Sequence, residues 1–176
     1  SNAVAAVGTA GFFTWFGSSL VYLSKIGTEI GLAQAIGKND NKERKKYIYS
    51  GLLINIIIAI TYMILILIFN ERLIGFFNLG DESIISMAKD YLIFVALGFI
   101  FSFLNPIFTG IFNASGSSRI PFFVNTVGLV INILLDPILI FGMFGFKGYG
   151  VKGAAIATVS AQLVVCIIFI IMFKRN

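Results

Sequence analysis

The sequence contains no histidine, a single cysteine and few charged residues. Without histidine, the chain has no imidazole to ligate a metal, to activate a serine or cysteine nucleophile, or to move protons in acid–base catalysis. The one cysteine, Cys166, lies in an apolar run and cannot form a disulfide within the chain. Because these absences remove most catalytic constellations, we expect the protein not to be an enzyme, and we expect no bound metal of the kind that histidine clusters hold.

Charged residues make up only 12% of the chain, whereas about 25% is usual for a soluble domain. Hydrophobic residues make up 58%, and the mean hydropathy is +0.95. Too little polar surface remains to cover a water-soluble core. No alternating segments of the barrel type occur, so the composition predicts an all-α, polytopic bundle of transmembrane helices. The basic residues lie between apolar runs, so the net charge of +5 indicates contact with the membrane and no nucleic-acid partner.

Five apolar runs are long enough to cross a bilayer as helices, which takes about 20 residues each. The runs lie at 4–36, 46–69, 85–112, 120–143 and 153–173. We expect the more polar end of the first run, from Lys25 onward, to leave the lipid, and Lys25 to pair with Glu29 there. Residues 1–3 have the composition of an expression-tag remnant, which leaves 4–176 as the membrane unit. The lack of a native first methionine predicts that this unit is a piece of something longer.

The loops between these runs differ in charge. The segment 38–46 carries five basic residues, whereas 70–90 is acidic, and alternate loops total eight basic residues against four. The positive-inside rule then places the 38–46 loop in the cytoplasm. We also expect Asp40 to cap the start of the second helix, with Glu43 three residues later, and Gly37 to cap the end of the first.

A stripe of polar and small residues follows one face of the fourth run. Asn125, Gly128, Asn132 and Asp136 fall within a narrow arc of a helical wheel, and the opposite face is apolar. Polar residues at membrane depth usually face the interior of a bundle or a water-filled cavity. We therefore expect this face to point away from lipid.

Pro137 follows Asp136 directly and removes a backbone hydrogen bond, which frees the carbonyl of Ile133 one turn back. A carboxylate, an amide oxygen and a free carbonyl form a hard oxygen cluster that suits H⁺ or Na⁺. Burying an ionised carboxylate costs at least about 2.5–3.5 kcal/mol on insertion scales, which favours a functional role for Asp136. The alternative is that Asp136 only bonds a neighbouring helix and that Pro137 is a tolerated kink.

Weaker polar stripes occur in two other runs, and they have two interpretations. Small and polar residues at these positions pack helices together in membranes, or they line a substrate cavity. The stripes consist of Ser102, Asn105, Thr109 and Asn113 in the third run, beside Pro106, and of Ala154, Thr158 and Gln162 in the fifth.

Several motifs then occur in the order found in one transporter family. They are GT at 27–28 and QAIG at 34–37 before a charged turn, NASGSSR at 113–119, NILLDP at 132–137 with FG at 141–142, and GVKGAAIAT at 150–158. Together they resemble the MATE family of multidrug and toxic compound extrusion transporters. The resemblance covers nearly the whole chain.

The resemblance implies a fold and a mechanism. The family has twelve helices in two lobes of six and exports cationic and amphiphilic drugs in exchange for Na⁺ or H⁺. By this likeness the five runs correspond to helices two to six of the N-terminal lobe, which is half of a two-lobed transporter. The likeness also implies that Asn132 and Asp136 bind the coupling cation or proton, that Thr158 joins their polar network and that Ala154 lies one turn before it.

Further expectations follow from the same resemblance. The first-helix aspartate of the family has no counterpart here, so copies of the chain would associate, or other segments would cover its polar faces. We expect a multi-pass protein of the plasma membrane, with small cationic or amphiphilic molecules and lipid as partners and with Na⁺ or H⁺ as the coupling ion. Pro137, Ala154, Asn125, Asn105 and Thr109 are candidates for lining the substrate cavity or for bending helices.

Three alternatives remain at this point. A lipid-linked oligosaccharide or polysaccharide flippase of the wider superfamily would have similar hydropathy but would need more cationic residues inside. A membrane enzyme would need paired acids at membrane depth, and Asp136 is the one clear acid there. A structural membrane module would tolerate the loss of the Asp136 carboxylate.

Overall fold

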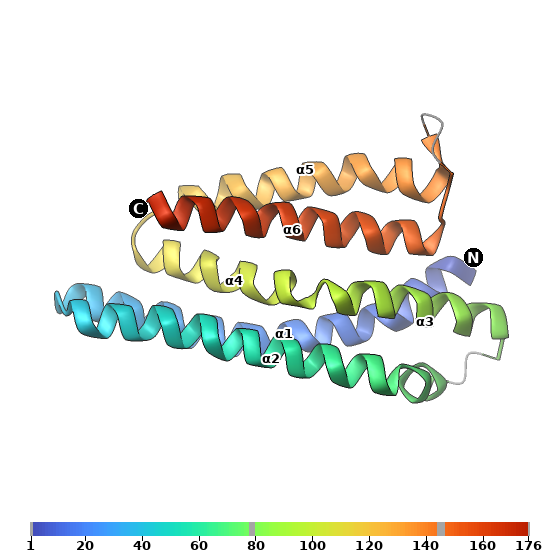
Figure 1. Cartoon of the computed structure of the whole chain (residues 1–176), viewed down its shortest axis with the longest axis horizontal. Helices are drawn as coiled ribbons and strands as arrows, with labels where there is room; N and C mark the ends of the chain where they lie inside the picture. The colour runs from blue at the N-terminus through green and yellow to red at the C-terminus, as the bar shows by residue number, and fades with distance from the viewer. Residues whose placement is uncertain (1, 78–79, 144–146, 176) are drawn as a thin grey trace.

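The computed structural model describes residues 2–77, 80–143 and 147–175, and within these it is a bundle of six α-helices without strands. The expected all-α class is therefore confirmed. Figure 1 shows the helices running nearly along one direction, with α5 and α6 side by side as a hairpin. The helices are α1 (Asn2–Gly37), α2 (Asn41–Gly75), α3 (Glu82–Leu97), α4 (Phe99–Ala114), α5 (Arg119–Phe141) and α6 (Val151–Arg175). Asn2 and Ala3 belong to α1, and Ser1 lies outside the described residues.

Four of these helices, α1, α2, α5 and α6, are each long and apolar enough to cross a membrane. The third predicted run, 85–112, was expected as one helix, and that expectation was wrong. It is divided into α3 and α4, which meet at Gly98 with a bend of 50° and together pass as a fifth, broken span. Gly98 faces the side chain of Val159 on α6, so the bend lies at a close contact with α6.

The two ends of the bundle separate the loops as the charge pattern predicts. Figure 1 places the α1–α2 turn, the α4–α5 turn and the C-terminus at one end, and the N-terminus, the α2–α3 connection and the α5–α6 connection at the other. The end with the α1–α2 turn carries the larger number of basic residues. The alternation of loops that underlies the predicted orientation is therefore present in the fold.

The turn between α1 and α2 is closed by side chains. Asp40 caps α2 as expected, since its carboxylate accepts hydrogen bonds from the N–H groups of Lys42 at 2.9 Å and Glu43 at 3.0 Å. The expectation that Gly37 caps α1 needs a correction. The left-handed residue after α1 is Asn39, with φ of 55°, because asparagine tolerates this region better than most residues. Arg44 then donates to the carbonyl of Ile36 at 3.0 Å and ties the turn together.

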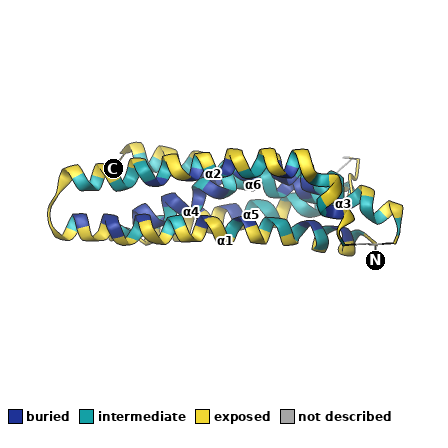
Figure 2. Ribbon diagram, turned by 90° about the horizontal axis from the view of Figure 1, so that it is seen from below, coloured by how far each residue is buried: buried dark blue, intermediate teal, exposed yellow. Residues whose placement is uncertain are grey.

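The core consists of aliphatic side chains together with several aromatic rings that lie between helices. The rings of Tyr62, Phe99 and Phe103 pack together where α2 meets α3 and α4, and Phe108 stacks on Phe169 of α6. Figure 2 shows exposed residues along the outward sides of the helices and buried ones toward the centre. Large apolar side chains such as Leu23 and Phe122 lie on that outer surface, as expected where helices face lipid.

Pro137 lies inside α5 and does not end it. The helix continues to Phe141 and stops at Gly142, whose φ of 78° is in the left-handed region and whose N–H donates to the carbonyl of Ile138. The connection to α6 then folds back, and the N–H of Tyr149 donates to the carbonyl of Leu139 at 2.8 Å. Because these bonds anchor the last turn, the proline is accommodated without breaking the span.

Candidate functional site

The middle of the polar stripe of α5, at Gly128 and Asn132, faces α6, whereas Asn125 of the same stripe is exposed. Val165 of α6 packs against the position where a β-carbon of Gly128 would lie, so the glycine lets the two helices approach closely. A small cavity of about 220 Å³ lies beside this contact. Its lining residues are Asn125, Gly128, Leu129, Asn132, Thr158, Ala161, Gln162 and Val165. Asn132 and Thr158, predicted to act together, therefore line one cavity from opposite helices.

Asn132 has an unpaired polar atom in this cavity. Its Nδ2 is inaccessible to solvent and has no hydrogen-bond partner among the described residues. An unsatisfied buried amide costs about 1–3 kcal/mol, and natural proteins usually keep one only where a ligand or another group meets it. Since an amide presents a donor and an acceptor, Asn132 can meet either kind of group at this point.

Asp136 lies one turn further along α5 and is half-buried. It is not among the residues that line the small cavity. In the described part of the chain it has no hydrogen bond or ion pair, and its one electrostatic partner is Tyr91 of α3. The carboxylate is therefore close to a residue that sequence analysis did not single out. The predicted coupling role of Asp136, Asn132 and Thr158 stays a prediction.

The donor set at this end of α5 fits a hard cation or a proton. Carboxylate, amide and hydroxyl oxygens are the ligand types that Na⁺ and similar ions take, whereas soft metals prefer thiolate and imidazole. The described residues contain no group of three or more His, Cys, Asp or Glu that could hold a metal. Ala154 lies on α6 one turn before Thr158 and has no polar side-chain group to contribute.

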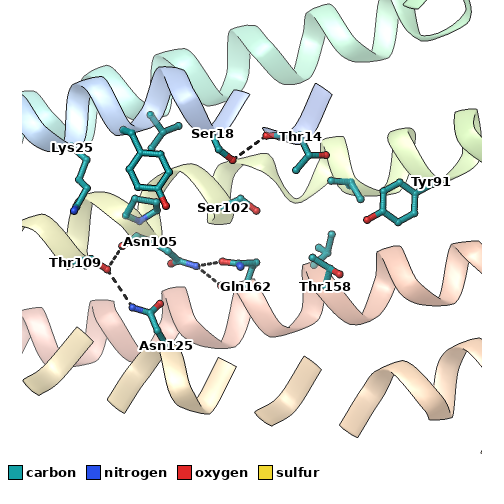
Figure 3. Close-up of a pocket in the computed structure, with 15 residues that line it drawn as sticks. Thr14, Ser18, Lys25, Tyr91, Ser102, Asn105, Thr109, Asn125, Thr158 and Gln162 are labelled. Atoms are coloured by element: carbon teal, nitrogen blue, oxygen red, sulfur yellow. Dashed lines mark hydrogen bonds between the residues drawn. The ribbon is translucent and has the colours of Figure 1, made fainter. Parts of the chain in front are cut away.

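A larger cavity of about 440 Å³ opens between the helices (Figure 3). Thr158 lines this cavity as well as the small one, so the two are neighbours. Its lining residues are Thr14, Ser18, Val21, Tyr22, Lys25, Tyr91, Val95, Ser102, Asn105, Pro106, Thr109, Asn125, Thr158, Val159 and Gln162. Five of the six helices contribute side chains, since α2 alone is missing from that set among the described elements.

A chain of hydrogen bonds crosses the wall of this main cavity (Figure 3). Asn105 of α4 donates through Nδ2 to Oε1 of Gln162 at 2.6 Å and to the Gln162 carbonyl at 3.0 Å. Thr109 donates to the carbonyl of Asn105 at 3.0 Å, and Asn125 of α5 donates to Thr109 at 3.5 Å. The weaker polar stripes therefore serve both of their interpretations, because the same residues join three helices and line a cavity.

Sequence analysis missed the contribution of α1 and α3. Thr14, Ser18 and Lys25 lie on one face of α1 at helical spacing, and this pattern was visible in the sequence. Tyr91 gives no comparable pattern in the sequence, since a single tyrosine in an apolar run is most simply explained as a packing residue. Only the fold brings it to the cavity and to Asp136.

A multi-pass helical bundle with hydrogen-bonding groups around a cavity at membrane depth is typical of a small-molecule transporter. The family model MatE matches residues 1–138, which is well over half of the chain. The chain therefore belongs to the MatE family, and it is a multi-pass protein of the plasma membrane. Members of this family are membrane transporters rather than enzymes, in line with the expectation above.

Individual relatives agree with this assignment. The chain is 28% identical over 176 residues to a probable multidrug resistance protein NorM of Thermotoga maritima, which covers 99% of this chain and 38% of the relative. It is 28% identical to an FAD transporter of Shewanella oneidensis, over 93% of this chain and 36% of that protein. A crystal structure of MATE in complex with MaD3S superposes with a TM-score of 0.88 at 26% identity, over 100% of this chain and 39% of that one.

The chain thus spans about 38% of the length of the curated relatives it matches. The names of these relatives describe multidrug resistance proteins and an FAD transporter, and nothing in the comparisons favours the flippase alternative. The likeness in fold extends over the whole bundle, including the bent third span.

Proposed function

We propose that this chain forms part of a cation-coupled antiporter that exports cationic or amphiphilic drugs in exchange for Na⁺ or H⁺. The observation that carries the proposal is the main cavity, which has the volume of a drug site and a wall from five helices with many neutral hydrogen-bonding groups and a cation, Lys25. In this view the described helices are helices two to six of an N-terminal lobe. Further helices, or a second copy of the chain, cover the sides where polar residues such as Asn125 are exposed.

The proposed coupling site lies at the end of α5 near α6. Asp136 is the group whose charge changes when it takes up a proton or a cation, and Asn132 and Thr158 supply neighbouring oxygens. The carbonyl of Ile133, which Pro137 leaves without its helical donor, adds another acceptor on the same turn. A bound ion can shift the balance between two conformations only if it binds one of them more tightly, and a half-buried carboxylate provides that difference.

The electrostatic interaction between Asp136 and Tyr91 supports a link from this site to the cavity. Tyr91 lines the main cavity and interacts electrostatically with Asp136, so a change in the charge of the carboxylate is felt at the cavity wall. Thr158 provides a second link because it lines both cavities. Coupling between ion and substrate would act through these two residues.

The proposal is tested by efflux from proteoliposomes that contain the protein in the longest form its gene encodes. Ethidium efflux is measured under an imposed Na⁺ gradient and, separately, under a pH gradient, for the wild type and Asp136→Asn. We expect efflux under one gradient and its loss in the variant. Asp90→Asn is the matched control, because Asp90 lines neither cavity and pairs with Lys152 at 3.1 Å.

Each result has a clear meaning. Efflux that follows one gradient in the wild type and in Asp90→Asn, but not in Asp136→Asn, supports the coupling role and identifies the ion. Equal efflux by all three proteins would show that Asp136 is structural. Absence of gradient-driven efflux in the wild type would count against drug antiport itself.

A further inference from the structure

The wall of the main cavity contains one formally charged side chain at neutral pH among the described residues, and it is Lys25. Its side chain is only 19% exposed. Lys25 precedes the last residue of α1 by twelve positions, which corresponds to roughly 18 Å along a helix. It therefore lies within the helical part of the bundle, and it pairs with Glu29 as the sequence predicted. The close-up shows its ammonium group pointing toward Thr109 and Asn125 (Figure 3).

Lys25 has one partner, and that partner does not saturate it. Its Nζ lies 3.2 Å from Oε2 of Glu29, and no other polar contact of Lys25 occurs in the described part of the chain. An ammonium group has three N–H donors, so two remain available. The order with lysine before glutamate at i and i+4 is also the weaker of the two orientations on a helix. Glu29 itself does not line the cavity.

The fold makes room for this pair in a specific way. Gly110 of α4 lies against it, and a β-carbon there would be 3.3 Å from Cγ of Lys25 and 3.4 Å from Oε2 of Glu29. The glycine therefore lets α4 pass close to α1 while the lysine stem runs along the cavity wall. The contact holds the charged end of Lys25 at one end of the cavity.

The opposite end of the cavity has a different character. Tyr91 lies there, far along the cavity from Lys25 in Figure 3, and it is the electrostatic partner of Asp136. Between the two ends the wall offers neutral groups such as Ser102 and Asn105. Among the described residues that line the cavity, the one formal charge therefore lies at the Lys25 end.

We infer that the preferred substrate is an amphiphile that carries a carboxylate or phosphate group, which binds Lys25. The inference rests on the proposed transport function and narrows its substrate class to zwitterions and anions. A hydrogen bond between ions is about twice as strong as one between neutral groups, and it is stronger still where water is scarce. A substrate with only positive charge lacks this charge-assisted bond at the Lys25 end and would bind more weakly.

Two dyes that differ in one group provide the test. Rhodamine 110 has a free carboxylate and rhodamine 123 is its methyl ester, so the second is a simple cation of nearly the same shape. Binding of each dye is measured at pH 7.5 by fluorescence polarisation, with the protein in its longest encoded form in lipid nanodiscs. The proteins are the wild type, Lys25→Gln, Lys25→Arg, Glu29→Gln and the loop control Lys45→Gln, in which an exposed lysine is changed.

We expect the wild type to bind rhodamine 110 about tenfold or more tightly than rhodamine 123, as a charge-assisted hydrogen bond provides. Lys25→Gln should remove this preference, Lys25→Arg and Lys45→Gln should keep it, and Glu29→Gln should strengthen it because Lys25 loses its competitor. Equal or tighter binding of rhodamine 123 by the wild type, or a preference that survives Lys25→Gln, would overturn the inference and leave drug transport intact. Failure of both dyes to bind would overturn the inference together with the drug-binding role of the cavity.

Discussion

At the scale of single residues, Asn105 shows how one amide joins two helices inside a membrane. The residue is 4% exposed, and both hydrogens of its amide are used by Gln162, once at the side chain and once at the backbone. A glutamine and an asparagine on different helices satisfy one another where water is scarce. The Oδ1 of Asn105 remains without a partner among the described residues, so the pair has a free acceptor beside the cavity.

Replacing Asn105 by alanine should therefore destabilise the bundle by about 0.6–1.7 kcal/mol, the range measured for hydrogen bonds between membrane helices. For a chain of this size, 1 kcal/mol corresponds to about 2–4 °C in Tm. The measurement is a thermal scan in detergent with a maleimide dye that reports exposure of the buried Cys166 thiol. Thr126→Ala is the control, since Thr126 bonds only within its own helix, and an equal loss in both variants would refute the role of Asn105.

Asp81, which lies outside the membrane spans, contributes to the stability of the folded state in a pH-dependent way. Hydrogen bonds from the side chain and the backbone of Ser83 lower the pKa of this exposed carboxyl, with further help from Ile84 and Asn2. A pKa that is lower in the folded state means that the stabilisation is present above the unfolded pKa of about 4 and is lost as the pH falls through the folded pKa.

Asp81→Asn should consequently melt below the wild type at pH 6–7, and the difference should shrink toward zero as the pH falls below about 4. Circular dichroism melts at half-unit steps of pH measure it. The asparagine keeps the capping oxygen, so the comparison isolates the charge. A difference that stays constant down to pH 3 would contradict this account.

At the scale of elements, Gly98 determines the shape of the third span. The hydropathy of the run 85–112 predicts one span. A single glycine is common in membrane helices, so the local sequence does not predict the bend of 50°. The bend arises where the backbone at Gly98 meets Val159 of α6. The glycine permits the close contact, and the packing of α6 against this position produces it.

Gly98→Ala should cost about 1–3 kcal/mol, because the new β-carbon would lie 3.0 Å from Cγ1 of Val159 and closer still to Cγ2. This loss should exceed the gain of about 0.5–1 kcal/mol that alanine usually brings over glycine in a helix. The Cys166 thermal scan again provides the measurement. Adding Val159→Ala should restore much of the loss, and Gly75→Ala, which meets no neighbouring atom, should be neutral or stabilising. Additive effects of the two substitutions would rule out the contact as the cause.

At the scale of the whole molecule, successive loops lie alternately at the two ends of the bundle. The alternation of basic and acidic loops predicts an orientation, and the bundle places the loops on the sides that this orientation requires (Figure 1). The cavity then has its Lys25 end toward the α1–α2 turn, where the basic loop lies.

Cysteine labelling should confirm this orientation. In intact cells, a membrane-impermeant maleimide should label Glu82→Cys at the start of α3 and should label Lys45→Cys only after lysis, because the positive-inside rule puts the α1–α2 end in the cytoplasm. Both positions are exposed, and the native Cys166 is 3% exposed and should stay unlabelled. Labelling of Lys45→Cys in intact cells would mean that the orientation is reversed.

The sequence by itself determined the class of protein, the number and approximate extent of the spans, and the family. Hydropathy and charge are sums over many residues, so they can be read without knowledge of contacts. The motif from Asn132 to Pro137 contributed to the family resemblance, and its coupling role stays a prediction. The position of Asn132 could also be assigned to a face that meets another helix, because helical periodicity fixes which residues share a side.

The tertiary structure alone decided which groups meet. It placed Tyr91 beside Asp136, joined Asn105 to Gln162 across two helices, bent the third span at Gly98 and turned Lys25 into the cavity. Each of these contacts joins residues from different helices or depends on a close approach between them. Spacing along one helix fixes the direction of a side chain relative to its own axis, but the neighbour it meets depends on how all the helices pack together.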